Sequence, residues 1–68
     1  MNYSIFIQNN TIFISELFPN EAEWIKKKLV NNNIEANYQH SKGHWFQYVT
    51  INNANVELLN KVKFIINN

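Results

Sequence analysis

The sequence predicts an α+β fold with the element order ββαββα, in which a four-stranded antiparallel sheet is covered on one face by two helices. Two observations carry this prediction. Four short segments alternate in the way that half-buried strands do, and two longer segments repeat apolar residues at the helical spacing. Each element then has one aliphatic face, and a layer of helices on a single sheet buries all of these faces together.

Composition sets the bounds of the chain. Its 68 residues predict a single domain, residues 1–68, near the lower size limit of chains that fold alone. A hydrophobic fraction of 46% argues against disorder, and the absence of Cys excludes disulfides and thiolate metal sites. The net charge is only +1, and Lys and Glu supply all of the charged side chains.

The first two strands form a hairpin in this interpretation. Residues 3–8 and 11–15 are β-rich and are separated by Asn9-Asn10. Because Asn tolerates positive φ, this dipeptide predicts a two-residue hairpin turn. In that register Phe6 lies opposite Phe13 on one side of the sheet, and isoleucines lie opposite isoleucines on the other.

The first helix is expected to open at Asn20. Asn20 and Glu23 have the spacing of a capping box, and Pro19 precedes them. The run 31–33, which is three asparagines, ends the helix, with Asn in the left-handed position that Gly usually occupies. The apolar stripe of this helix comprises Ala22, Ile25 and Leu29.

The second half repeats the pattern of the first. Residues 34–40 and 44–51 are predicted strands, joined by a hairpin in which Gly43 supplies positive φ. The last helix runs from about Asn55 to Ile66 and has the clearest periodicity in the sequence. Its stripe comprises Leu58, Leu59, Val62, Ile65 and Ile66.

A sheet of this kind has one covered face and one open face. The predicted core beneath the helices is Ile5, Ile7, Ile12, Ile14, Leu17, Ile25, Leu29, Ile34, Ala36, Val49, Ile51, Leu59, Val62 and Ile66. The opposite face carries Phe6, Phe13, Phe46 and Tyr48, flanked by Asn37, Gln39 and Thr50. No further element is predicted to cover these rings, so we expect an open, aromatic sheet face.

Two segments resemble the ribonucleoprotein motifs of RNA-recognition-motif (RRM) domains. IFISEL (residues 12–17) is similar to the second motif, and Phe13 occupies its aromatic position. FQYVTI (residues 46–51) is similar to the first motif, and Phe46 and Tyr48 occupy its two aromatic positions. In that family these aromatics stand on adjacent central strands of the open face and stack on bases.

The chain departs from the RRM pattern at three points. Lys42 and Gly43 lie two residues too early for the basic-glycine pair, Gln47 replaces a small residue, and no strand follows the last helix. The strand at 3–8 is expected to occupy the missing position, which implies a circularly permuted ferredoxin-like sheet. A second resemblance, of EAEWIKKKLVNNNIEA with its following hairpin and helix to small putative prokaryotic signal-transducing domains, implies the same core.

The predicted function is binding rather than catalysis. The partner-binding residues are expected to be Phe6, Phe13, Phe46 and Tyr48, with Trp24 as a second contact or as a ring covered by lysine stems. The expected partner is a protein, and the role an inhibitor or adaptor, of the kind by which small phage or mobile-element proteins block host nucleases or defence complexes. A homodimer through the sheet face is a further alternative.

The other alternative is single-stranded RNA or DNA binding of the RRM kind. Its expected residues are Phe13, Lys42, His44, Phe46 and Tyr48. With no Arg and a net charge of +1, a stacking surface of this sort lacks the phosphate contacts that dominate nucleic-acid affinity.

No catalytic residue, metal or cofactor is expected. His40 and His44 flank a hairpin tip without the further ligands that zinc requires, and Ser41 between them lacks a buried base and acid. No apolar run approaches the length of about 20 residues that spans a bilayer, and no signal peptide is recognised. The expected location is therefore cytoplasmic.

Overall fold

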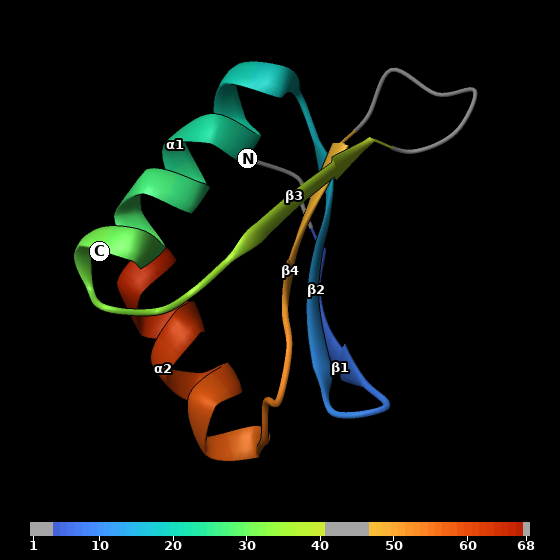
Figure 1. The fold of residues 1–68 in the computed structure, drawn as a ribbon, viewed down its shortest axis with the longest axis vertical. Helices are drawn as coiled ribbons and strands as arrows, with labels where there is room; N and C mark the ends of the chain where they lie inside the picture. The colour runs from blue at the N-terminus through green and yellow to red at the C-terminus, as the bar shows by residue number, and fades with distance from the viewer. Residues whose placement is uncertain (1–3, 41–46, 68) are drawn as a thin grey trace.

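The computed structural model describes residues 4–40 and 47–67 and shows a single sheet with both helices on one side (Figure 1). The strand order is β1-β2-β4-β3, and every neighbouring pair is antiparallel. This confirms the predicted α+β fold in a ferredoxin-like arrangement. The elements are β1 (Ser4–Gln8), β2 (Thr11–Leu17), α1 (Pro19–Asn31), β3 (Asn37–His40), β4 (Gln47–Ile51) and α2 (Val56–Asn67).

The β1-β2 hairpin has the predicted turn and register. Asn9 and Asn10 have φ of 52° and 59°, the left-handed pair that a two-residue hairpin with the correct twist requires. Phe6 pairs with Phe13, and isoleucines pair on either side of them. The turn therefore sets which side chains of both strands face the helices and which face away.

A bulge in β2 returns Leu17 to the core. Ile14 pairs with Val49 and Leu17 pairs with Gln47, so β2 advances three residues where β4 advances two. Without the extra residue, the strict alternation of a strand would place Leu17 on the open face. Instead Leu17 is fully buried, as predicted, at the point where the chain enters α1.

The N-cap of helix α1 lies two residues earlier than the predicted cap at Asn20. It is Phe18, whose backbone N–H donates to Oε1 of Glu21 at 3.1 Å, and Pro19 is the first helical residue. The predicted capping pair of Asn20 and Glu23 is therefore wrong, because proline's fixed φ already suits the first helical turn. At the other end Asn33 is left-handed (φ 62°), as expected for the asparagine run.

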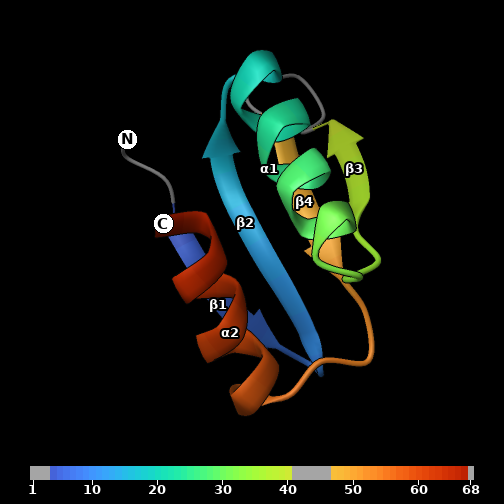
Figure 2. The same cartoon turned by 90° about the vertical axis from the view of Figure 1, so that its left-hand side faces the viewer.

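The third strand is shorter than predicted. Residues 34–36 do not belong to β3: its pairing with β4 begins at Asn37 and Thr50, and β4 extends only one residue further, to Ile51. Ile34 and Ala36 are nevertheless buried, in agreement with the predicted core. In Figure 2, α1 lies over β4 between β2 and β3, and α2 lies over β1.

Helix α2 begins where the sequence indicates. The backbone N–H of Leu58 donates to Oδ1 of Asn55 at 2.8 Å, which makes Asn55 the N-cap. The segment before it is tied to the first hairpin, because the backbone N–H of Ala54 donates to the carbonyl of Asn10 at 2.7 Å. Among the described residues, no helix is long and apolar enough to cross a membrane.

The core lies between the sheet and the helices. Compared with the predicted set, Ile5, Ile7 and Leu59 are only partly buried. Ile5 and Ile7 lie on the edge strand β1, and Leu59 lies on α2, the helix that packs over this edge. The buried hydrophobic residues of this core, among those described, are Ile12, Ile14, Leu17, Ala22, Ile25, Leu29, Ile34, Ala36, Val49, Ile51, Ala54, Val62, Ile65 and Ile66.

Candidate binding surface on the open sheet face

The face of the sheet that points away from the helices carries the candidate site. Strand alternation and register place one row of side chains across all four strands of this face: Phe6, Phe13, Thr50 and Asn37, in that order. Both helices pack on the other face of the sheet (Figure 1), so no described helix covers this row.

Three aromatic rings form a continuous group on this face, which we call the aromatic face: Phe6, Phe13 and Tyr48. The rings of Phe6 and Phe13 are stacked, with centroids 5.4 Å apart and an interplanar angle of 18°. The rings of Phe13 and Tyr48 are tilted by 41°, with centroids 6.5 Å apart. Both separations fall in the range in which aromatic pairs attract one another, so the strands hold the rings as one surface.

Polar but uncharged side chains continue the surface toward β3. Thr50 lies on the open side but is buried. It is flanked by its cross-strand partners, Phe13 on β2 and Asn37 on β3. Asn37 and Gln39 are exposed and share this face. The surface therefore combines stacked rings with amide groups that both donate and accept hydrogen bonds.

The lysines that the structure describes lie in the helical layer. They are Lys26, Lys27 and Lys28 in α1 and Lys61 and Lys63 in α2. No lysine lies in a described strand. A row of cations beside the rings, which a nucleic-acid surface uses to contact phosphates, is thus lacking in the described part of the sheet.

The predicted site residues are only partly brought together. Phe6, Phe13 and Tyr48 meet on the aromatic face, and Phe13 and Tyr48 lie on adjacent central strands, as the RRM resemblance implies. Phe46, Lys42 and His44 lie outside the described residues.

Trp24 does not belong to the aromatic face. It lies on α1, in the opposite layer, and 43% of its surface is exposed. The Nζ atom of Lys28 lies 4.7 Å from the centroid of its ring, a cation–π contact one helical turn away. This contact agrees with the interpretation of Trp24 as a ring covered by a lysine side chain. The exposed part of the ring still offers a contact surface.

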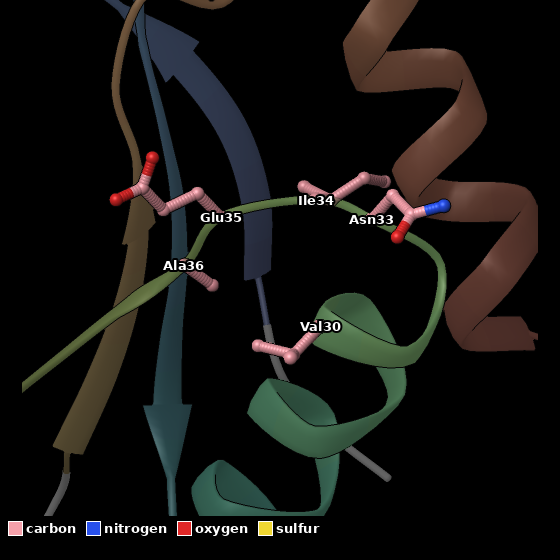
Figure 3. Close-up of a pocket in the computed structure, with 5 residues that line it drawn as sticks. All are labelled: Val30, Asn33, Ile34, Glu35 and Ala36. Carbon is pink, nitrogen blue, oxygen red and sulfur yellow. The ribbon is translucent and has the colours of Figure 1, made fainter.

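Two hollows near the start of β3 had no counterpart in the sequence prediction. The first hollow, of about 330 Å³, lies beside the end of α1 (Figure 3). It is lined by Val30, Asn33, Ile34, Glu35 and Ala36. The other, of about 260 Å³, is lined by Glu35, Asn37, Asn52 and Asn53. Pairing of the β3 start with the β4 end creates this second hollow, so only knowledge of that pairing could have predicted it.

Comparison with known proteins assigns neither a family nor a function to this chain. No family model matches the chain, and no curated protein or solved structure shows significant similarity to it. Within the described residues, no three His, Cys, Asp or Glu side chains are grouped as metal ligands.

Proposed function

We propose that this chain is a small non-enzymatic binding protein whose aromatic face docks on an apolar patch of a protein partner. One observation carries the proposal: Phe6, Phe13 and Tyr48 form one contiguous ring surface, while every described lysine lies in the helices. Fixed aromatic side chains lose little conformational entropy on binding and often dominate interface energies. An inhibitor or adaptor role suits such a surface.

Partner capture with matched ring variants tests the proposal. The tagged chain, a Phe6→Thr/Tyr48→Thr variant and a Phe64→Ala control, which removes an exposed ring from α2 in the other layer, are used to capture proteins from the lysate of the host cell. A candidate partner is then purified and titrated against all three. We expect the double variant to bind at least about tenfold more weakly, because two ring contacts are lost, and the control to bind as the wild type does. Equal binding by the double variant would contradict the proposal.

Threonine replaces the rings in this design for two reasons. Thr favours strands, so the sheet is retained. Phe6 and Tyr48 flank Phe13, so their removal leaves the central ring in place as part of the scaffold. Circular dichroism and a urea titration of each variant verify that folding is intact.

Single-stranded nucleic-acid binding is the second candidate, favoured by the position of Phe13 and Tyr48 on adjacent central strands. Titration of labelled poly-U and poly-dT at two salt concentrations distinguishes it from protein binding. Saturable binding at low salt that Tyr48→Thr abolishes would support this candidate; no binding at low salt would eliminate it. Light scattering over a range of concentrations tests the remaining alternative, self-association through the aromatic face.

A further inference from the structure

A polar hollow adjoins the aromatic face at the edge where β3 begins and β4 ends. Asn37 is the first residue of β3 and lies in the same row as Phe13 and Thr50. Asn52 and Asn53 follow β4 directly. Together with Glu35 these asparagines enclose about 260 Å³. The hollow is thus part of the surface that a partner seated on the rings would cover.

The lining consists of one carboxylate and three carboxamides. The Glu35 side chain is turned away from Val30, and its carboxylate is directed toward β4 (Figure 3). Asn53 has a left-handed backbone (φ 54°), which sets the direction of the chain after β4. The Glu35 carboxylate accepts hydrogen bonds, and each carboxamide adds an acceptor oxygen beside its NH₂ donors. The hollow therefore favours a cationic group with several donors.

The donor set distinguishes between cationic ligands. Ca²⁺ requires six to eight oxygen ligands, usually with several carboxylates, whereas Glu35 is the one carboxylate among the described residues that line this hollow. An ammonium group is a compact point charge, but a guanidinium is planar, has five N–H donors and binds a carboxylate with two parallel hydrogen bonds. An arginine side chain matches the carboxylate and the surrounding amide oxygens best.

We infer that this hollow receives an arginine side chain of the protein partner. The inference rests on the proposed function, because it names the chemistry of the partner that the aromatic face engages. Two strand spacings separate Asn37 from Phe13, a distance of about 10 Å. The partner therefore presents an arginine about 10 Å from the apolar group that contacts Phe13.

Nuclear magnetic resonance on the full chain tests the inference directly. N-acetyl-L-arginine amide and N-acetyl-L-lysine amide are titrated separately into ¹⁵N-labelled protein, and the side-chain amides of Asn37, Asn52 and Asn53 are followed. We expect saturable shifts with the arginine probe and binding several-fold weaker with the lysine probe.

Charge variants supply the matched control. Glu35→Gln removes the carboxylate and should weaken arginine-probe binding about tenfold, since a charge-assisted hydrogen bond is lost. Glu23→Gln removes the same charge from an exposed position on α1 and should leave binding unchanged. The ¹⁵N spectrum of each variant shows whether it is folded.

The results separate this inference from the proposed function. Absence of saturable shifts at the hollow, equal binding by Glu35→Gln, or the same shifts with Ca²⁺ but not with the arginine probe would each overturn the arginine inference. Ring-dependent capture of a partner would then still stand. Conversely, capture that is independent of Phe6 and Tyr48 refutes the proposed function even where the probe binds.

Discussion

The stacked pair of Phe6 and Phe13 provides a quantitative test of the open face. About half of the Phe6 surface is buried, since 42% is exposed, and complete burial of a Phe side chain contributes about 1.5–3 kcal/mol. The ring–ring contact adds about 0.5–1.5 kcal/mol. Phe6→Ala should therefore lower the free energy of unfolding by about 2 kcal/mol, a tolerable loss for a chain expected to have about 3–10 kcal/mol in total.

A double-mutant cycle isolates the contact itself. Urea unfolding of the wild type, Phe6→Ala, Phe13→Ala and the double variant gives the coupling energy, which we expect to be about 1 kcal/mol. Circular dichroism monitors the sheet, and equal m-values show that the variants unfold in the same way. If the losses of the two single variants sum to that of the double variant within about 0.3 kcal/mol, the rings do not touch. The continuous aromatic face would then be refuted.

Three further predictions concern the framework. In the left-handed turn, Asn10→Val should cost about 1–2 kcal/mol while Asn10→Gly stays close to the wild type, as measured by thermal unfolding; equal melting temperatures would contradict the turn. Leu17→Ala should cost about 2–5 kcal/mol in urea unfolding, and a loss below about 1 kcal/mol would contradict the bulge that buries it. Lys28→Gln should cost about 0.5–1 kcal/mol through the lost contact with Trp24, an effect that should vanish in a Trp24→Ala background.

Elements with a local physical cause could be predicted from the sequence. The turn at Asn9 and Asn10 fixes its own geometry, and through it the pairing of Phe6 with Phe13. The alternation of the strands places Tyr48 on the same face as Phe13, again without knowledge of distant contacts.

Features that depend on pairing between distant segments could not be predicted. Alternation continues through Ile34 and Ala36, yet β3 begins only at Asn37, where its pairing with Thr50 of β4 starts. Burial of Leu17 follows from its apolar character, but the bulge that permits it is set by the pairing of β2 with β4. The polar hollow combines the ends of both strands, so local sequence contains no signal for it.

Separation of the two sheet faces makes the chain a candidate scaffold for designed binders. The side chains that hold the fold together point toward the helices, whereas Phe6, Asn37, Gln39 and Tyr48 point the other way and none of them belongs to the buried core cluster. These positions can be randomised in a display library while the aliphatic core is kept. The framework contains no cysteine, so a new recognition surface could be selected in reducing as well as oxidising surroundings.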